Sequence, residues 1–418
     1  MIQTLCKRAY EAKPAMLRLT TACKNDILRR IAAALIERTD EIIAENKKDI
    51  DAGRTAGLSE ALIDRLALTP GRIEGMAASL HTIADFPDPV GSIEYGFRTE
   101  SGLTIEKVRT PLGVIGIIYE SRPNVTVDAA ALCLKAGNVA ILRGSSSAIH
   151  SNKYLANLFN EVGKRYGLPD AAVQLIEDTD RAVLDELIRQ DGLIDVLIPR
   201  GGKGLKKYIS QNGSIPVIVT GAGTCHAFVD ASADPTDAVA IIINGKTQRP
   251  STCNSLECIL VHRNTPDRLV NDIVQALTAA KVRVNCTKQL TVRLEDENRK
   301  MVHPADESAF GTEYLSLEIL MHEVAGIDDA IAFINRYGTN HSDVILTKDL
   351  ENAEKFLNDV DSACVYLNAS TRFSDGGEFG FGGEIGISTQ KLHARGPMGI
   401  KELTGLKYVI RGKGEVRA

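Results

Sequence analysis

The sequence predicts an α/β protein with a doubly wound, parallel-sheet domain, a second α/β domain and a projecting hairpin. Three observations lead to this prediction. Short apolar strands alternate with helices from Val114 onward, and the alternation resumes after a cysteine-bearing loop at 248–255. Between the N-terminal helices and the first strand lies a polar segment with a central glycine, Gly102. The content of 44% hydrophobic and 25% charged residues is ordinary for a globular chain of 418 residues, which has room for two or three domains.

The first eighty or so residues are predicted to be helical. Asn25 and Asp26 can cap a helix, because their side chains accept hydrogen bonds from free backbone N–H groups. Thr69 followed by Pro70 is typical of a helix start. The apolar positions that follow Asp26 fall near one stripe of such a helix: Ile27, Ile31, Leu35, Ile42 and Ile43.

A hairpin is expected over residues 92–113. The prolines and glycine of 87–91 end the helical pattern, and Gly102 lies near the middle of the segment that follows. The hairpin is too polar to form a core of its own. An oligomer contact and an ordinary surface hairpin are equally consistent with the pattern.

The first α/β block begins with the strand at Val114. A helix is expected over Val125–Lys135, a strand ending at Gly144, and a helix over Ala148–Gly163. Three further apolar runs are predicted strands: VQLIED, DVLIPRGG and PVIVTGAG. Strands that alternate with helices at this spacing form a parallel sheet, which binds nucleotides beyond the carboxyl ends of its strands.

Two strand ends in this block carry loops that suit a phosphate. Glycine lets backbone approach the anion closely, and a helix N-terminus favours negative charge. Neither loop has the strict GxGxxG spacing, so an ordinary tight turn explains each of them equally well. The residues concerned are Arg143, Gly144, Ser145 and Ser146 in the first loop, and Arg200, Gly201, Gly202, Lys203 and Gly204 in the second.

Cys253 is the candidate nucleophile. It stands in a polar loop, beside Ser251, Thr252 and Asn254, directly before an apolar strand at 256–261. A thiol at the edge of a strand is held rigidly and can be reached by substrate. A free cysteine is more often a small buried hydrophobe, and Cys258 within the strand is interpreted as such.

The second α/β block follows this loop. A helix is expected over Pro266–Ala280, a polar stretch over 295–313, and helix, turn and strand over 324–347. The glycine-rich segment 376–386 is interpreted as a packed loop, because Phe379, Phe381 and Ile385 lie within it, although a flexible loop has a similar composition. The tail after residue 405 reads as a strand that pairs with a sheet edge.

Composition excludes several classes of function. A net charge of -5 gives no support for binding to nucleic acid or anionic membranes, and no apolar run is long enough to span a bilayer. The N-terminus lacks the apolar core of a signal peptide. Eight scattered cysteines in a chain this long indicate reduced thiols and a cytoplasmic location. No CxxC or HExxH pair supports a metal site, so no metal is expected.

Three blocks resemble a known family. The order of domains resembles the aldehyde dehydrogenase superfamily, and within it three segments are similar to the γ-glutamyl phosphate reductases. These segments are YESRPNVTVDAAALCLKAGN at 119–138, VAGIDDAIAFINRYGTNHSDVI at 324–345 and HARGPMGIKELT at 393–404. The resemblance implies an enzyme of proline biosynthesis that reduces L-glutamyl 5-phosphate to L-glutamate 5-semialdehyde with NADPH. It makes Cys253 the expected nucleophile, which forms a thioester.

Departures from ordinary aldehyde dehydrogenases are informative. Those enzymes hydrolyse the thioester with water activated by a glutamate, whereas the matching segment TGAG places Thr220 there. A general base for hydrolysis is therefore missing, which fits exchange with phosphate. Asn124 and the backbone N–H of Cys253 are candidate donors to the oxyanion.

The resemblance also assigns cofactor residues. NAD-preferring relatives often carry a glutamate where this chain has Ser146, three residues after Arg143. Arginine and serine receive a 2′-phosphate that a carboxylate would repel, so NADP(H) is expected. Glu313 corresponds to the glutamate that holds the nicotinamide ribose, although a solvated loop carboxylate is the ordinary interpretation of such a residue.

Cations are expected near an acyl phosphate. Arg122 is placed on the substrate and Arg249 near the departing phosphate, and Asn124 and Asn254 are added as substrate residues; Lys135 lies in the same family block. Surface or inter-domain ion pairs explain the arginines equally well. Whether His341 and His393 titrate or only donate hydrogen bonds stays open.

The predicted domains and partners follow from the same resemblance. Residues 1–89, 113–245 and 385–405 would form the cofactor domain, 246–384 the catalytic domain, and 90–112 with 406–418 an oligomerisation hairpin and tail strand. A homo-oligomer is expected, and a separate glutamate 5-kinase would supply the acyl phosphate through transient contact. Two alternatives remain: a relative that transfers its acyl group to coenzyme A, and an inactive relative that keeps the fold alone.

Overall fold

The computed structural model describes residues 1–417, with the backbone alone for residues 61 and 203. The chain forms two compact units, which we describe separately. The first comprises Met1–Val219, Gly380–Gly386 and Met398–Ala418, and the second comprises Thr220–Phe379 and Ile387–Pro397. The α/β fold class predicted from the sequence is confirmed in both units.

The N-terminal helices differ from the prediction in their boundaries. The expected single stripe is divided between two helices that break at Arg38, and the helix cap is Thr20, whose hydroxyl accepts from the N–H of Cys23 at 3.2 Å. Asn25 lies inside the helix instead, where its side-chain oxygen accepts from Lys135 Nζ at 2.6 Å. The start at Thr69 is confirmed, because its hydroxyl accepts from the N–H of Arg72 at 3.3 Å. The helices are α1 (Ile2–Leu17), α2 (Thr21–Glu37), α3 (Thr39–Thr55), α4 (Glu60–Leu66) and α5 (Pro70–Asp85).

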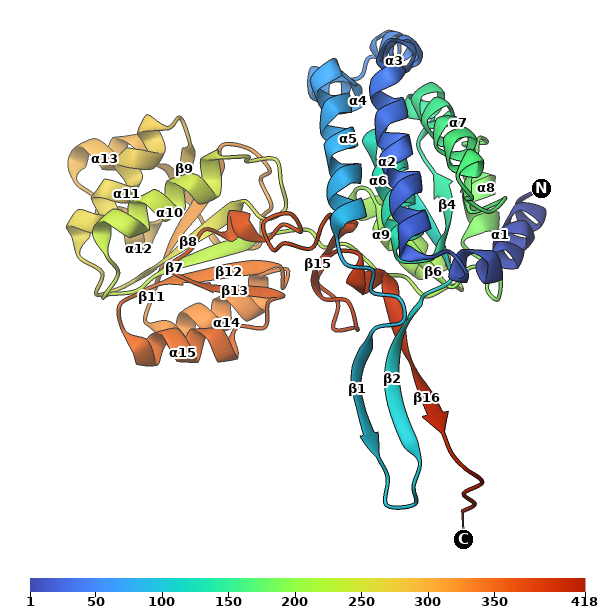
Figure 1. The fold of residues 1–418 in the computed structure, drawn as a ribbon. Coiled ribbons are helices and arrows are strands. Elements are labelled where there is room, and N and C mark those ends of the chain that lie inside the picture. The colour runs from blue at the N-terminus through green and yellow to red at the C-terminus, as the bar shows by residue number, and fades with distance from the viewer. Residues whose placement is uncertain (418) are drawn as a thin grey trace. The chain divides into compact units, whose positions relative to one another are not determined.

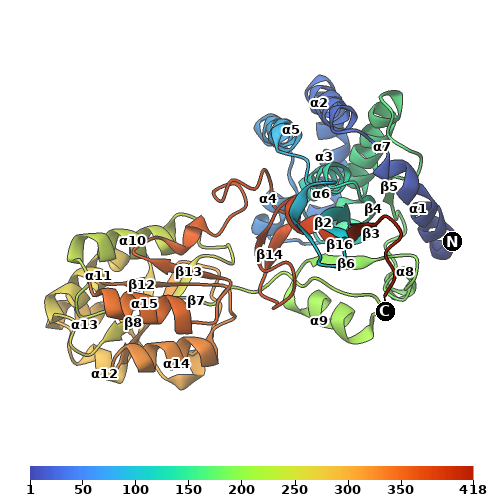
Figure 2. The same cartoon turned by 60° about the horizontal axis from the view of Figure 1, so that its bottom comes forward.

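The central sheet of the first unit is parallel, with strand order β5-β4-β3-β6. Helices α1, α6, α7 and α9 pack on its strands, and α2 and α5 pack in turn on α6 (Figure 2). This double cover explains why every residue of β3 is buried. The elements are β3 (Val114–Tyr119), α6 (Asn124–Lys135), β4 (Val139–Arg143), a 3₁₀ turn (Ser146–Ala148), α7 (Ile149–Arg165), β5 (Val173–Leu175), α8 (Arg181–Leu187), β6 (Val196–Arg200) and α9 (Lys203–Asn212).

The predicted strand PVIVTGAG is wrong. Val217 forms an isolated bridge with Leu197, and Thr220 forms another with Ser388. Pro216 has no N–H to donate and Gly221 and Gly223 follow closely, so a continuous ladder does not develop.

A three-stranded antiparallel sheet projects from the first unit as a narrow ribbon, with order β1-β2-β16 (Figure 1). Gly102, with φ +98°, supplies the left-handed position in the turn of the predicted hairpin. The expected pairing of the tail strand with a sheet edge is confirmed by β16 on β2. The elements are β1 (Ile93–Arg98), β2 (Thr104–Pro111), a 3₁₀ turn (Lys401–Leu403) and β16 (Thr404–Arg411).

The second unit is built on a seven-stranded sheet of order β10-β9-β11-β8-β7-β12-β13, in which all neighbouring strands are parallel. Two separate apolar cores form, one with α10 and α11 and the other with α14 and α15 (Figure 1). The strands are β7 (Cys225–Val229), β8 (Leu256–His262), β9 (Arg283–Thr287), β10 (His303–Ala305), β11 (Glu318–Val324), β12 (Ser342–Leu346) and β13 (Cys364–Leu367). The helices are α10 (Pro235–Thr247), α11 (Asp267–Ala279), α12 (Lys288–Thr291), α13 (Asp296–Met301), α14 (Ile327–Tyr337) and α15 (Leu350–Asp359), with 3₁₀ turns at Glu307–Ala309 and Thr371–Phe373.

The chain passes between units at places that differ from the expected boundaries. Residues 225–245, expected beside the cofactor loops, form β7 and most of α10 in the second unit, because β7 pairs with β8 and β12. Of the segment 385–405, residues 387–397 belong to the second unit. Two short strands, β14 (Gly386–Ser388) and β15 (Gly396–Met398), lie at the last two points where the chain passes from one unit to the other.

Candidate active site

Cys253 lies in the loop between α10 and β8, at the amino end of a buried strand. It is partly exposed, whereas Cys225, Cys258, Cys286 and Cys364, the remaining thiols of the second unit, are buried. Burial raises the pKa of the Cys225 and Cys258 thiols well above the usual range, which makes them poor nucleophiles. The interpretation of Cys258 as core is confirmed by its 2% exposure.

The backbone of Gly223 lies directly against Cys253. A Cβ on residue 223 would stand 1.4 Å from the carbonyl oxygen of Cys253, so only glycine fits there. The same oxygen accepts a hydrogen bond from the Cys225 thiol at 3.3 Å. These contacts fix the backbone that carries the candidate nucleophile.

The loop is also tied to the segment after β13. The amide of Asn254, which is 3% exposed, donates to the carbonyl oxygens of Ser374 at 3.0 Å and Arg372 at 3.3 Å. In return, the Thr371 hydroxyl donates to the Asn254 carbonyl at 2.7 Å. The Asn254 side chain therefore holds the loop, and its expected contact with substrate stays a prediction.

Two arginines lie near the nucleophile. Arg249 is exposed on the loop, and Arg372, which the sequence analysis missed, donates to Thr252 Oγ1 at 2.9 Å and Gln248 Oε1 at 2.8 Å. Burial and then the positive charge of Arg249 lower the pKa of Arg372, and Cys253 is close enough to interact electrostatically with it. The guanidinium of Arg372 therefore attracts anions beside the thiol, and the charge of Arg249 adds to the positive potential there. Nothing in the polar segment around residue 372 distinguishes that arginine from other loop cations.

Glu313 lies at the same end of the second unit. Its Oε1 accepts from the N–H of Gly223 at 2.7 Å, which connects the Glu313 segment to the glycine that packs on Cys253. The sequence placed Glu313 and Cys253 in one site, sixty residues apart in the chain. Through Gly223 the structure connects them within a single unit.

A series of hydrogen-bonded side chains, which begins at His341 and continues through three hydroxyls, lies near the Cys253 loop. His341 is fully buried, and its Nδ1 is 2.8 Å from Ser342 Oγ and 3.9 Å from the Cys225 sulfur. Ser342 Oγ then contacts Ser374 Oγ at 2.5 Å, which in turn contacts the Tyr366 hydroxyl at 2.8 Å. The second histidine of the family blocks, His393, is exposed.

The first predicted phosphate loop follows β4. Its backbone is tight at Gly144, where a Cβ would stand 2.1 Å from the Asn152 amide nitrogen. Arg143 is held by the next loop, because its guanidinium donates to the Thr179 carbonyl at 2.7 Å. Ser145 Oγ contacts Ser147 Oγ at 2.6 Å, and Ser146 is exposed.

The second predicted phosphate loop follows β6 and leads into α9. Gly201, Gly202 and Gly204 precede or begin this helix, and the N–H of Gly202 donates to Glu120 Oε2 at 3.0 Å. The carboxylate of Glu120 also covers Gly201, where a Cβ would stand 2.7 Å from its carboxyl carbon. Since β4 and β6 flank β3 in a parallel sheet, both loops and Glu120 lie at the same sheet edge.

The family block at 119–138 spans the turn from β3 into α6. Arg122 is exposed there, and the Asn124 amide donates to Asp128 Oδ2 at 2.9 Å. Asp128 Oδ1 is buried and has no hydrogen-bond partner among the described residues, and burial raises the pKa of Asp128 to about 6. Lys135 is buried and donates to the Ala84 carbonyl at 2.8 Å, so its contacts are structural. Thr220, which the resemblance places where ordinary aldehyde dehydrogenases have a general base, is 4% exposed.

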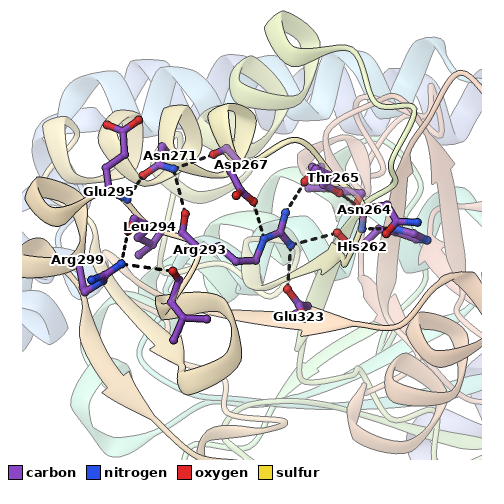
Figure 3. Close-up of polar contacts among 12 residues, drawn as sticks. His262, Asn264, Thr265, Asp267, Asn271, Arg293, Leu294, Glu295, Arg299 and Glu323 are labelled. Carbon is purple, nitrogen blue, oxygen red and sulfur yellow. Dashed lines mark hydrogen bonds and ion pairs between the residues drawn. The ribbon is translucent and has the colours of Figure 1, made fainter.

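The carboxyl end of β8, opposite Cys253, carries a different polar cluster (Figure 3). Arg293 donates to Glu323 at 2.9 Å and Asp267 at 2.8 Å, and also contacts the carbonyl oxygens of His262 and Thr265. The cluster joins the ends of β8 and β11 to the start of α11. Each guanidinium nitrogen of Arg293 has a protein partner, which indicates a structural role for the cluster.

Within residues 1–417, no group of three or more His, Cys, Asp or Glu side chains is arranged to hold a metal ion. None of the described helices is long and apolar enough to cross a membrane. The expected cytoplasmic location stays a prediction.

Comparisons with known proteins agree on one family. The family model for the aldehyde dehydrogenase family matches residues 1–309. A γ-glutamyl phosphate reductase from Campylobacter curvus is 52% identical over 439 residues, with 100% of this chain and 99% of the relative covered. Another from Francisella philomiragia is 50% identical over 411 residues, with 98% of each covered.

Solved structures show the same relationship. The crystal structure of a γ-glutamyl phosphate reductase from Thermotoga maritima matches with a TM-score of 0.96 and 45% identity over 100% of both chains. An acetylating aldehyde dehydrogenase from Geobacillus thermoglucosidasius matches with a TM-score of 0.70 and 19% identity, covering 100% of this chain and 97% of the other, and so shares the fold.

Proposed function

The chain belongs to the γ-glutamyl phosphate reductases of the aldehyde dehydrogenase family, and we propose that it uses Cys253 and NADPH to reduce L-glutamyl 5-phosphate through a thioester. Membership makes it an oxidoreductase of proline biosynthesis that acts with a nicotinamide cofactor. One observation carries the proposal for the nucleophile: Cys253 is the single partly exposed thiol among the five cysteines of the second unit, all of which are described. It also lies close enough to Arg372 for the two side chains to interact electrostatically, and Arg249 precedes it by four residues on the same loop.

The first chemical step is acyl transfer to sulfur. The Cys253 thiolate attacks the acyl carbon of the substrate, a C–S bond forms, and the C–O bond to phosphate breaks with its electron pair leaving on phosphate. Arg372 and Arg249 offer positive charge where that dianion departs. The N–H of Cys253 and the Asn124 amide remain the candidate oxyanion donors.

The second step is reduction of the thioester. NADPH, when bound, supplies the hydride that this carbonyl carbon accepts. The C–S bond then breaks, which releases L-glutamate 5-semialdehyde and returns the Cys253 thiolate. The chain's own residues fit such a cofactor: the loops of Gly144 and Gly201 lie at one sheet edge, and Arg143, Ser145 and Ser146 favour a 2′-phosphate. Gly202 and Gly204 begin α9, whose N-terminus favours phosphate, and Glu313 is the proposed ribose ligand.

Phosphate is proposed as the acyl acceptor in the reverse direction, with water excluded. Thr220 stands where a glutamate would activate water, and a buried threonine hydroxyl is no general base at neutral pH. The guanidinium of Arg372 beside the thiol supports an anionic acceptor. Arg122 is proposed as a substrate residue because it is exposed just before α6. Asn254 is proposed because it follows Cys253 directly in the chain.

The reverse reaction tests the proposal, because the acyl phosphate itself is labile. NADPH formation from L-glutamate 5-semialdehyde and NADP would be followed with and without phosphate, for the wild type and Cys253→Ser. Phosphate-dependent formation that disappears in the serine variant is expected. Formation without phosphate would mean that water is the acceptor. Transfer to coenzyme A in place of phosphate would favour a relative that passes its acyl group to coenzyme A. No reaction by the folded protein would favour an inactive relative that keeps the fold alone.

Self-association is proposed through the β1-β2-β16 sheet. Large apolar side chains of this sheet are between 43% and 57% exposed, and they alternate along β1 and β16: Ile93, Tyr95, Phe97, Leu406, Tyr408 and Ile410. An apolar face of this kind supports a homo-oligomer. We also propose that the kinase that makes the acyl phosphate passes it to this protein through transient contact.

A further inference from the structure

A fully buried ion pair lies directly behind the nucleophile loop. Lys246, in the last turn of α10, places Nζ 2.8 Å from Oε2 of Glu257, the second residue of β8, and both side chains are 0% exposed. Burial raises the pKa of Glu257 to about 7 and lowers that of Lys246, although each charge favours the other. Apolar residues of similar volume often serve stability as well as a buried pair does. The pair therefore calls for an explanation beyond stability.

The second oxygen of Glu257 holds a turn. Oε1 accepts from the N–H of Leu315 at 3.2 Å. Leu315 has φ +54°, the left-handed region that a residue with a branched side chain avoids, and its side chain is 40% exposed, so apolar packing does little to offset the strain. Such a conformation persists where surrounding contacts impose it, commonly at functional sites.

This turn carries Glu313, two residues before Leu315. Glu313 Oε1 accepts from the N–H of Gly223, and Gly223 packs on the carbonyl of Cys253. Four residues after Cys253 the chain reaches Glu257. The contacts therefore close a ring within the second unit: Cys253, Gly223, Glu313, Leu315, Glu257 and back to Cys253.

We propose that the Lys246–Glu257 pair is a positioning device, which holds Leu315 in its left-handed conformation and so aims the Glu313 carboxylate at the nicotinamide ribose of the cofactor. The inference rests on the proposed function, in which Glu313 is a cofactor ligand. A carboxylate suits this role because an ionised oxygen is a stronger acceptor for the Leu315 N–H than a neutral one. The positive charge of Lys246 favours the ionised form of that carboxylate and so opposes the effect of burial on its pKa.

The ring predicts which substitution compensates for loss of the pair. Lys246→Met with Glu257→Leu removes both charges and leaves neither unpaired. Without the hydrogen bond, Leu315 should relax to negative φ and displace Glu313. Glycine adopts positive φ about as readily as negative φ, so Leu315→Gly should allow the original turn without the pair. Leu315→Ala shortens the side chain but keeps the Cβ penalty, and is the matched control.

The experiment measures NADPH binding to the intact protein by nicotinamide fluorescence, together with the thermal midpoint and the rate of Cys253 alkylation. We expect Kd to rise about tenfold in the double variant, as the loss of one aimed charged contact predicts. Adding Leu315→Gly should restore Kd to within about threefold of wild type, and adding Leu315→Ala should not. If the double variant does not fold, Glu257→Gln, which keeps an acceptor for Leu315, should show a smaller rise in Kd that Leu315→Gly also reverses.

Two results would overturn the inference alone. One is wild-type NADPH affinity in the double variant while Glu313→Gln binds weakly. The other is a loss of affinity that Leu315→Gly fails to repair, which would make the pair an ordinary structural contact. If wild-type protein binds no NADPH, or Glu313→Gln binds as well as wild type, the cofactor assignment in the proposed function fails first.

Discussion

The backbone of Gly223 lies so close to Cys253 that a Cβ on residue 223 would stand 1.4 Å from the Cys253 carbonyl oxygen. The same residue donates its N–H to Glu313 at 2.7 Å. One glycine thus makes both the contact that fixes the backbone of the proposed nucleophile and the contact that fixes the proposed ribose ligand. The site of the second unit is organised around a residue that brings no side chain to it.

Gly223→Ala is therefore expected to damage the site more than any distant glycine substitution. The added methyl group must displace the Cys253 loop, which we expect to cost about 2–4 kcal/mol of stability and about 100-fold in kcat/KM. Thermal unfolding and the reverse assay measure the two effects. Gly75→Ala, in α5 with nothing within 4 Å of its added Cβ, is the control and should be neutral or stabilising. Equal activity of the two variants would contradict the role of Gly223.

Arg372→Gln should weaken phosphate use. Arg372 lies near Cys253 and is held by Thr252 and Gln248, so its guanidinium is positioned before any ligand arrives. We expect KM for phosphate in the reverse reaction to rise about tenfold or more, and alkylation of Cys253 to require a higher pH. Arg372→Lys should rescue little, because a lysine cannot reproduce the two directed contacts. A phosphate dependence that changes with Arg249→Gln and not with Arg372→Gln would show that the wrong arginine has been chosen.

The stability of Asp128→Asn should depend on pH in a defined direction. Burial raises the pKa of Asp128 to about 6 in the folded protein, whereas an unfolded aspartate titrates near ~3.9. The folded state then binds the proton more tightly, so ionising this carboxyl costs stability between these pH values and the full cost is present above the higher one. Asparagine does not titrate. The variant should match wild type near pH ~4 and exceed it by on the order of 2 kcal/mol at pH ~7, in thermal midpoints taken across that range. If the gain in stability is the same at every pH, burial does not raise the pKa of Asp128 in the folded protein.

Glu120→Gln should tighten cofactor binding. Glu120 Oε2 accepts from the N–H of Gly202 at 3.0 Å, at the helix start where a cofactor phosphate is expected. A carboxylate there repels a phosphate and competes for the same donor. Removing its charge should lower the Kd for NADPH about threefold to tenfold, with a weaker salt dependence of binding. Weaker binding by the variant would indicate that Glu120 contacts the cofactor favourably.

Sequence reasoning located the fold well, because strand and helix periodicities are local signals. It placed β3, β4, β6 and β8 and the hairpin within a few residues. It failed at β7, where the apolar run PVIVTGAG is a stronger local signal than CHAFV at 225–229. The pairing of β7 with β8 and β12 is a long-range property that decides the outcome.

The site was predictable to the extent that single residues carry chemistry. Cys253 was singled out from its polar loop before an apolar strand and Glu313 from the resemblance, and both roles stay predictions. Arg372 was missed because loop arginines are common, and the Lys246–Glu257 pair because the sequence does not show that two charges will be buried together. No local sequence pattern indicates which residues far apart in the chain will be in contact.

Charge placed on the exposed face of the β1-β2-β16 sheet should disrupt self-association. Phe97 and Tyr408 are 51% and 56% exposed on β1 and β16, and the Tyr408 hydroxyl lies 3.3 Å from that of Tyr95. If this face packs on a second copy of the chain, Phe97→Glu with Tyr408→Glu would bury two added carboxylates in the contact, and only the one at residue 408 would have a cation, Lys107, as its cross-strand neighbour. We expect the variant to sediment as a smaller species than wild type while each chain keeps its fold, because these side chains contribute little to the protein's own core. Glu106→Gln and Lys407→Gln, on the opposite face of the same sheet, form the control and should leave the oligomer intact. An unchanged sedimentation coefficient in the first variant would assign the contact to another surface, and the hairpin would then be an ordinary exposed element.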